Sequence, residues 1–258
     1  MSIVIKTDGI DVSRFGDAMR RVAMEEKLSE GFSVYSEGAV HKAVKLYVDP
    51  DPDHHEVPLL GSIVDVFNES GVTEVQTGSF TPLLPKLRKL LDKYPVTVLH
   101  PFPIRTAHRW LDKETGEMST PKNKGRHKSP YSVAAAVFGI RELIGHPNLK
   151  IRILAYEREE FRALDGRGKT RKRGATMLGR LPTRLVGEYS FAAVSDIRDF
   201  IPEGLSKTFT QKEYLKAIKS HSRYDTIAIK LLEYFGVVRK IGKQGRAYLY
   251  EITPQNDN

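Results

Sequence analysis

The sequence predicts an α/β fold in which helices flank a mixed sheet, followed by a small C-terminal module. Short β-prone runs separated by turn residues occupy 56–76, and a leucine-rich helical stripe then precedes another apolar strand. A helix between two such strands indicates a crossover and hence a mixed sheet. Helix-capping signals and a hairpin after residue 200 indicate the module. We expect an N-terminal extension (1–32), an α/β domain (33–165), a basic loop and linker (166–199) and the C-terminal module (200–258).

The composition narrows the class of protein. With 258 residues, the chain is long enough for one large or two modest cores. Its net charge of +9 favours a polyanionic partner. The lack of cysteine excludes disulfides and thiolate metal sites, and it fits a reducing cytoplasm. The sequence shows no signal-peptide pattern and no apolar run near the roughly 18 residues of a membrane span, so we expect a cytoplasmic protein without membrane segments.

Two helices are predicted before the strands. One covers residues 15–27, and the other covers 33–47, where apolar residues from Val40 to Tyr47 recur at the spacing of an amphipathic helical face. Glu37 lies beside that face near the start of the second helix. Either a site at the nearby sheet or the helix dipole alone accounts for an acidic residue there.

Two acidic residues lie on neighbouring predicted strands. Asp65 falls near the end of the run 62–67, and Glu74 falls in the next run, 72–76, after a turn at 68–71. If the strands pair about that turn, the two carboxylates converge at one end of the sheet. Two hard oxygen ligands at one place are what a Mg²⁺ ion requires. The alternative is that both are solvated carboxylates at strand ends.

The rest of the α/β domain follows from simpler signals. Residues 79–93 form a helix with a leucine stripe, and 96–99 form a strand closed by the prolines that follow. A polar loop punctuated by Gly and Pro covers 112–130, before a helix at 131–144 and a strand at 150–156. The core order is therefore helix, three strands, helix, strand.

This order, with an acid on the second strand and Glu-x-Gln on the third, resembles the PD-(D/E)XK nuclease superfamily, to which type II restriction enzymes belong. The resemblance implies a restriction-endonuclease-like fold whose catalytic residues are Asp65, Glu74, Gln76 and Glu37. It also implies that Asp65, Glu74 and the backbone carbonyl of Val75 hold Mg²⁺ or Mn²⁺. Because relatives often dimerise to cut two strands, a homodimer is compatible with the resemblance.

The chain departs from the family pattern at one position. Where relatives carry Lys, it has Gln76, which offers hydrogen-bonding groups but no charge or basicity near neutral pH. Gln76 can orient a water, and a lysine elsewhere in the chain, Lys86 or Lys42, would have to supply the positive charge. The sequence is therefore compatible both with an active nuclease and with one that has lost catalysis.

A basic stretch without a single acid runs through 167–184. Lys and Arg in a Gly-rich loop can follow a phosphate backbone. The alternative is a solvated loop that is merely basic. The residues predicted to bind nucleic acid here are Arg167, Lys169, Arg171, Lys172 and Arg173.

Three histidines suggest a second kind of metal site. His41 lies on the predicted helix with Glu37, while His54 and His55 are adjacent in a loop rich in Pro and Asp. Adjacent histidines in such a loop are more typical of ordinary loop residues than of ligands.

The C-terminal module carries two helix signals and a hairpin. A capping box at Thr210 opens one helix, and Ser222 caps a second that reaches Phe235. Strands at 237–241 and 247–252 follow, joined by a Gly-bounded turn. This pattern resembles a winged helix-turn-helix domain, which implies that the second helix enters the major groove of DNA, although such modules also bind proteins. The residues implied to contact DNA are Ser222, Arg223 and Tyr224 in the second helix, and Lys240, Lys243 and Arg246 in the wing.

Two classes of function follow from these patterns. The first is a metal-dependent DNA endonuclease that hydrolyses phosphodiester bonds and is targeted by the winged helix. The second is a non-catalytic DNA-binding or transcription-regulatory protein on a degenerate nuclease scaffold. An RNA-processing enzyme is a third alternative, because basic loops do not distinguish DNA from RNA.

Overall fold

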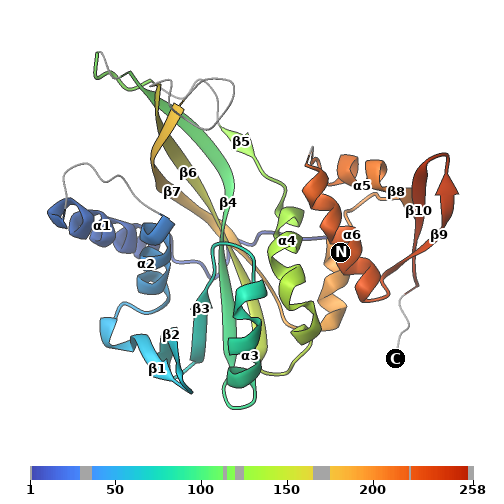
Figure 1. The fold of residues 1–258 in the computed structure, drawn as a ribbon, viewed down its shortest axis with the longest axis horizontal. Coiled ribbons are helices and arrows are strands. Elements are labelled where there is room, and N and C mark those ends of the chain that lie inside the picture. The colour runs from blue at the N-terminus through green and yellow to red at the C-terminus, as the bar shows by residue number, and fades with distance from the viewer. Residues whose placement is uncertain are drawn as a thin grey trace.

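The computed structural model describes residues 2–29, 37–112, 115–119, 125–164, 175–220 and 222–254. A mixed sheet forms the centre of the larger part of the molecule, with helices on both faces (Figure 1). A separate three-stranded sheet belongs to the C-terminal part, on the side away from the first two helices (Figure 1). The predicted α/β class, with a mixed sheet and a small C-terminal module, is thereby confirmed.

Two helices cover one face of the central sheet. They are α1 (Val12–Ser29) and α2 (Glu37–Val48), and they pack against each other. Their buried residues, Phe15 and Val44 among them, share a core cluster with Leu154 of the sheet. Before α1, Lys6 exchanges backbone hydrogen bonds with Glu188 at the sheet edge. The segment predicted as an N-terminal extension is therefore packed into the α/β part.

After α2 the chain forms three antiparallel strands, a helix and a further strand, which is the predicted order. These elements are β1 (His55–Leu59), β2 (Ser62–Asn68), β3 (Gly71–Val75), α3 (Leu84–Leu91) and β4 (Val96–Leu111). The first three form a meander, and β4 lies parallel to β3 because α3 crosses over between them. The helix predicted over 79–93 is shorter than expected, since a 3-10 turn, η2 (Thr81–Leu83), precedes it.

The turn between β2 and β3 depends on Gly71. Its φ is +99°, in the left-handed region that favours glycine. A Cβ at this position would lie 2.4 Å from the carbonyl oxygen of Pro95. The turn therefore requires glycine both for its backbone conformation and for the close approach of the chain before β4.

Three long strands extend the sheet beyond the meander: β4, β6 (Leu149–Leu164) and β7 (Ala175–Phe191) (Figure 1). The sheet order is β1-β2-β3-β4-β6-β7, and the short β5 (Arg126–His127) also pairs with β4. The predicted end of a strand at Leu99 is wrong, because β4 continues through the two prolines that follow. β3 stops pairing at Leu99 and β5 begins to pair at Arg105, so β4 is an edge strand on that side at the two prolines, and edges tolerate proline.

β7 corrects the prediction of a basic loop and linker over 166–199. Residues 175–191 pair antiparallel with β6. Buried side chains such as Leu185 and Tyr189 recur along the strand, as a half-buried strand requires. Arginines of β7 meet carboxylates of β6: Arg184 donates to both carboxylate oxygens of Glu157 at 3.1 Å. Dense basic charge hides this strand pattern in the sequence.

The helix predicted over 131–144 is a succession of short turns. These are η3 (Pro130–Val133), α4 (Ala134–Val137) and η4 (Phe138–Leu143). Ile140 has non-helical backbone angles and is fully buried. It belongs to the same core cluster as Leu231 and Leu232 of the C-terminal module. Packing against that module therefore accompanies the break in the helix.

The C-terminal module follows its predicted element order. The 3-10 helix η5 (Val194–Phe200) lies in the segment predicted as a linker and leads into the module. The elements of the module are β8 (Thr208–Thr210), α5 (Gln211–Ala217), η6 (Arg223–Thr226), α6 (Ile227–Tyr234), β9 (Val238–Gln244) and β10 (Ala247–Ile252). Its sheet has the order β8-β10-β9. The capping box of Thr210 with Glu213 and the cap of Ser222 are confirmed. Within the described part of the chain, no helix is long and apolar enough to span a membrane.

Candidate functional site

The two predicted acidic residues meet where β2 and β3 separate. The antiparallel ladder between these strands ends at the pair of Val66 and Thr73. Asp65 and Glu74 are the next residues on the two strands, so they stand opposite each other where the strands part. Beyond that point β3 continues along β4 instead, with Glu74 paired to Val98. Strand separation thus opens a space lined by two carboxylates.

Each carboxylate satisfies a backbone group of the other strand. Oδ2 of Asp65 accepts a hydrogen bond from the Val75 amide at 2.7 Å, and the Glu74 carboxylate hydrogen-bonds with the backbone of Asp65. These bonds replace the ladder that the separating strands no longer form. From α2, Nε2 of His41 lies 3.3 Å from Oδ2 of Asp65. The helix that carries Glu37 therefore also brings a histidine to Asp65.

Lys86 of α3 brings a positive charge to Glu74. Its Nζ lies 2.5 Å from Oε1 of Glu74 and 2.5 Å from the carbonyl oxygen of Ile63. Glu74 is only 2% exposed, and the Lys86 ammonium pairs with its buried carboxylate. Of the two lysines predicted to supply charge, Lys86 therefore reaches the site, whereas Lys42 is exposed on α2.

The two carboxylates have opposite pKa shifts. Burial raises the pKa of Asp65, but the hydrogen bond and charge of His41, with the Val75 amide, outweigh burial and hold that pKa below its ordinary value. Burial raises the pKa of Glu74 to about 7, with the charge of Asp65 adding to burial and Lys86 opposing it. Near neutral pH one carboxylate is ionised while the other is close to its midpoint, a pattern that clusters at functional sites.

The acidic pair fits a divalent cation. Mg²⁺ is usually held by one or two carboxylates together with waters and substrate phosphates. Asp65 and Glu74 supply two carboxylates from neighbouring strands at the point where the strands separate. No group of three or more His, Asp or Glu side chains forms a metal cluster among the residues that the structure describes. A cation held here would therefore have the carboxylate pair, backbone oxygen and water as its donors.

The other residues implied by the family resemblance contribute less directly. The Gln76 Nε2 donates to the carbonyl oxygen of Ser79 at 2.8 Å, so this side chain is already engaged. Val75 is buried, with its amide bound to Asp65. Glu37 is the first residue of α2, and its side chain lies outside what the structure describes.

Sequence reasoning missed His100, which supports the end of β3. Its Nδ1 lies 2.6 Å from the carbonyl oxygen of Gln76, and its ring packs edge-on against Phe80. Burial lowers the pKa of His100 to about 4, so the ring is neutral near pH 7 and Nδ1–H donates to Gln76. The signal available in the sequence was a histidine directly after a strongly apolar strand.

His54 and His55 belong to a separate cluster around Asp49. His54 Nδ1 and Asn68 Nδ2 each lie 2.8 Å from Oδ2 of Asp49, and His55 Nε2 lies 2.8 Å from its carbonyl oxygen. Burial raises the pKa of Asp49, but hydrogen bonds from Asn68, a loop amide and His54 outweigh burial and lower it to about 2. The cluster ties the loop after α2 to β2. Of the three histidines, His41 is the one at the acidic pair.

The predicted nucleic-acid-binding residues fall into two groups. In the C-terminal module, Arg223 and Tyr224 are exposed, Tyr224 at 86%, while Ser222 is partly buried as the cap of η6. The second group, the residues predicted in the basic stretch, lies outside the described residues: Arg167, Lys169, Arg171, Lys172 and Arg173.

The hairpin of β9 and β10, predicted as a wing, presents its cations unequally. Nζ of Lys243 lies 5.4 Å from the ring centroid of Tyr248, and Arg246 is exposed at the tip. Nζ of Lys240 lies 3.1 Å from a carboxylate oxygen of Glu233 on α6. Lys240 is therefore partly neutralised within the module.

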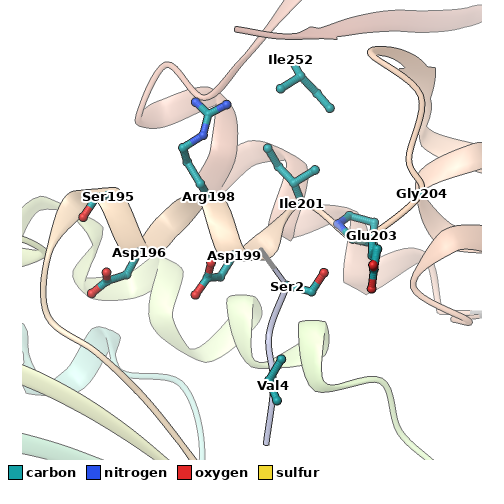
Figure 2. Close-up of a pocket in the computed structure, with 11 residues that line it drawn as sticks. Ser2, Val4, Ser195, Asp196, Arg198, Asp199, Ile201, Glu203, Gly204 and Ile252 are labelled. Atoms are coloured by element: carbon teal, nitrogen blue, oxygen red, sulfur yellow. The ribbon is translucent and has the colours of Figure 1, made fainter. Parts of the chain in front are cut away.

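A large cleft lies between the N-terminal segment and η5, and the charged residues of η5 that line it form hydrogen bonds within the protein (Figure 2). It encloses about 1020 Å³, with Ser2 on one side and Asp196, Arg198 and Asp199 of η5 on the other (Figure 2). Asp196 accepts hydrogen bonds from two backbone amides at 2.9 Å, and Arg198 donates to a backbone carbonyl at 2.9 Å. Asp199 accepts a hydrogen bond from the Tyr189 hydroxyl at 3.2 Å. These groups hold the fold together, and none of the predicted site residues lines the cleft.

Comparison with known proteins shows which family the α/β part of the chain matches. The family described as "Domain of unknown function (DUF8091)" matches residues 38–192, more than half of the 258-residue chain. The chain belongs to this family. The DUF8091 match runs from α2 through β7, and therefore contains Asp65, Glu74 and Lys86, whereas the C-terminal module lies outside it.

Similarity to one relative extends further than the DUF8091 match. An uncharacterized protein of Treponema pallidum (strain Nichols) is 27% identical over 224 residues, which cover 86% of this chain and 88% of the relative. This span is longer than the DUF8091 match, so the similarity reaches beyond that domain. No solved structure matches the chain.

Proposed function

We propose that this protein is a Mg²⁺-dependent nuclease that hydrolyses phosphodiester bonds in DNA. The observation that carries the proposal is the convergence of Asp65 and Glu74 where β2 and β3 separate, with Lys86 against Glu74. Around them the chain follows the order helix, three strands, helix, strand of the PD-(D/E)XK nucleases that its sequence resembles. Two carboxylates and an ammonium are a suitable set for metal-assisted hydrolysis.

In this proposal, Asp65, Glu74 and the backbone carbonyl of Val75 hold Mg²⁺ or Mn²⁺. When bound, such a cation polarises the scissile phosphate and lowers the pKa of a water. His41 keeps Asp65 oriented through its 3.3 Å contact and favours the ionised carboxylate. The chain therefore preorganises one ligand from each of the separating strands.

Lys86 takes the part that relatives give to the lysine of the third strand. Its ammonium reaches Glu74 from α3, while Gln76, at the family's lysine position, is bound to Ser79. An ammonium beside the metal ligands can donate a hydrogen bond to the attacking water and offset charge on the phosphate. The water gives up a proton to solvent and its oxygen bonds to phosphorus as the bond to the leaving sugar oxygen breaks, and that leaving oxygen takes up a proton from solvent.

The C-terminal module supports DNA as the substrate. Its elements follow the order of a winged helix, with Arg223 and Tyr224 exposed at the start of η6, and Lys243 and Arg246 exposed in the wing. The net charge of +9 favours a polyanion. In this proposal the module positions the acidic pair on the duplex.

One observation favours the alternative of a non-catalytic DNA-binding protein. Gln76 lacks the charge of the family lysine, and its amide is bound to Ser79 rather than directed at the acidic pair. If Lys86 does not replace that lysine, the site binds a cation without cleaving DNA.

The deciding experiment incubates the purified protein with duplex, single-stranded and branched DNA, and with RNA, in Mg²⁺, Mn²⁺ or EDTA. We expect metal-dependent cleavage of DNA that disappears in Glu74→Ala, while this variant keeps its fold by circular dichroism and its affinity for DNA. DNA binding without cleavage in any metal supports the alternative. Unchanged cleavage by Glu74→Ala contradicts the assignment of the site.

A further inference from the structure

A second polar cleft lies between the long strands of the sheet and the C-terminal module. It encloses about 470 Å³ and shares no lining residue with the acidic pair. Residues of β4 and β6 line it on one side, and the segments before η3 and η6 line it on the other. The cleft therefore joins the α/β part to the module at a place where neither the family resemblance nor the proposed nuclease activity assigns a role.

The charges that line this cleft are mainly positive. Its four cationic side chains are Lys128, Arg158, Arg162 and Lys219, and its two carboxylates are Glu160 and Asp225. Four positive and two negative charges leave +2, before either lining histidine is protonated. A surplus of that size inside a cleft favours a bound anion.

Glu160 organises the arginines without neutralising them. It is 4% exposed, and its carboxylate accepts hydrogen bonds from Arg158 at 2.8 Å, Arg162 at 3.0 Å and Arg180 at 3.3 Å. Burial raises the pKa of Glu160, but these guanidinium groups hold it below its ordinary value. Arg158 and Arg162 both line the cleft and share this one carboxylate, so positive charge remains on this side of the cleft.

Unpaired donors are concentrated in the same cleft. Among the described residues, five buried side-chain atoms have no hydrogen-bond partner, and three belong to residues lining it: Nδ1 of His108, Oγ of Ser129 and Nε of Arg162. Ser129 is 6% exposed, and Nδ1 of His108 lies 3.5 Å from Glu160, at the outer limit of hydrogen-bond distance. Native proteins rarely leave such groups unpaired, and an exception calls for an explanation such as a functional role or a bound water or ion. Nε of Arg162 can only donate, and the Ser129 hydroxyl and the His108 ring can donate as well, so a single acceptor group can satisfy all three atoms.

We propose that this cleft binds a phosphomonoester dianion, as carried by the end of a nucleic acid strand or by a mononucleotide. The charge of such a group balances the surplus of +2, whereas a phosphodiester within a strand carries a single negative charge. Arg158 and Arg162 offer the forked donors that suit phosphate oxygens, and Ser129 adds a buried hydroxyl. The inference goes beyond the proposed nuclease activity, because it requires neither a metal nor cleavage.

The test measures binding in EDTA, where metal-dependent cleavage cannot occur. Fluorescence anisotropy compares two oligonucleotides, labelled at the same end, that differ only in a terminal phosphate at the other end. Inorganic phosphate and adenosine monophosphate serve as unlabelled competitors. We expect the phosphorylated strand to bind at least about tenfold more tightly, the effect of one charge-assisted hydrogen bond.

Three variants make the test specific to the cleft. Arg158→Gln should abolish the preference for the terminal phosphate, and Ser129→Ala should reduce it. Arg184→Gln is the matched control, because Arg184 pairs with Glu157 and does not line the cleft. It should keep the preference. If Arg158→Gln does not fold, the test rests on Ser129→Ala, because that substitution breaks no ion pair.

Each outcome separates this inference from the proposed nuclease activity. Competition by adenosine monophosphate or inorganic phosphate, without a preference for the strand end, assigns the cleft to a free phosphomonoester and supports the inference. Equal affinity with and without the terminal phosphate, and no competition, overturns it. Glu74→Ala should retain the preference, so loss of cleavage in that variant has no bearing on this cleft.

Discussion

Nζ of Lys86 lies 2.5 Å from Oε1 of Glu74, and this contact joins α3 to β3 where β2 and β3 separate. Glu74 therefore lies between two opposing charges: Asp65, which raises its pKa, and Lys86, which lowers it. Because burial raises this pKa to about 7, small changes around Glu74 alter its charge near neutral pH. We therefore expect the protonation of Glu74 to affect the pH dependence of cleavage and of cation binding, which can both be measured.

Replacing Lys86 with Met should slow cleavage and shift its pH dependence. The substitution keeps a long apolar side chain but removes the charge that lowers the pKa of Glu74, so that pKa rises above its present value of about 7. The acid limb of the rate profile should move to higher pH, and the rate at neutral pH should fall at least about tenfold. Cleavage rates measured across pH test this. Lys89→Met, an exposed lysine on the same helix, is the matched control; an identical profile for both variants contradicts a role for Lys86.

Affinity for a divalent cation should rise with pH through neutrality. Glu74 has a pKa of about 7 in the protein without metal, so a cation must displace its proton below that pH. We expect the affinity for Mn²⁺ to rise about tenfold per pH unit below neutrality and to level off above it, as for one displaced proton. Isothermal titration calorimetry at several pH values measures this. Glu74→Gln, which cannot titrate, should bind Mn²⁺ at least about tenfold more weakly and with a flat pH dependence.

The cluster around Asp49 should matter for stability and not for metal binding. Asp49→Ala leaves His54 and Asn68 without their acceptor, and should lower the free energy of unfolding by about 1–3 kcal/mol. The folded pKa of Asp49, about 2, lies below its ordinary value of 3.8. Its contribution is therefore present above pH 3.8 and lost as the pH falls through about 2. Urea denaturation at neutral and acid pH measures both effects. Reduced Mn²⁺ affinity in a folded Asp49→Ala variant would return His54 and His55 to consideration as ligands.

The salt dependence of DNA binding should distinguish the cations of the wing. Lys243→Ala and Arg246→Ala should each reduce the slope of log affinity against log salt by about one, as for one lost phosphate contact. Lys240→Ala should change the slope less, because Glu233 already lies 3.1 Å from Nζ of Lys240. Binding titrations in EDTA over a range of salt concentrations give these slopes. Equal slopes for all three variants and the parent protein contradict DNA contact by the wing.

Local patterns in the sequence predict much of this fold. The order of α2, three strands, α3 and β4 follows from apolar periodicity and turn residues, and the caps of Thr210 and Ser222 from their own short motifs. The opposition of Asp65 and Glu74 follows from pairing about a turn that only Gly71 allows. Each of these features depends on residues close in sequence, so a short stretch of sequence is enough to predict it.

Strand lengths could not be predicted in the same way. Pro101 and Pro103 favour the end of a strand, yet β4 continues because β3 leaves its edge open beyond Leu99. The basic residues of 175–184 favour a loop, yet they form β7 because carboxylates such as Glu157 of β6 neutralise arginines such as Arg184. In both cases a neighbouring strand, distant in sequence, reverses the local preference.

The sequence by itself determined the α/β class, the acidic pair and the C-terminal module. Only the tertiary structure decided that Lys86, and not Lys42, reaches Glu74, and that His41 contacts Asp65 from α2. It also decided that Ser129 and Arg158 line one cleft with the C-terminal module. The physical reason is that periodicity and capping act over a few residues, whereas a site depends on the register of strands and on the packing of helices across the sheet.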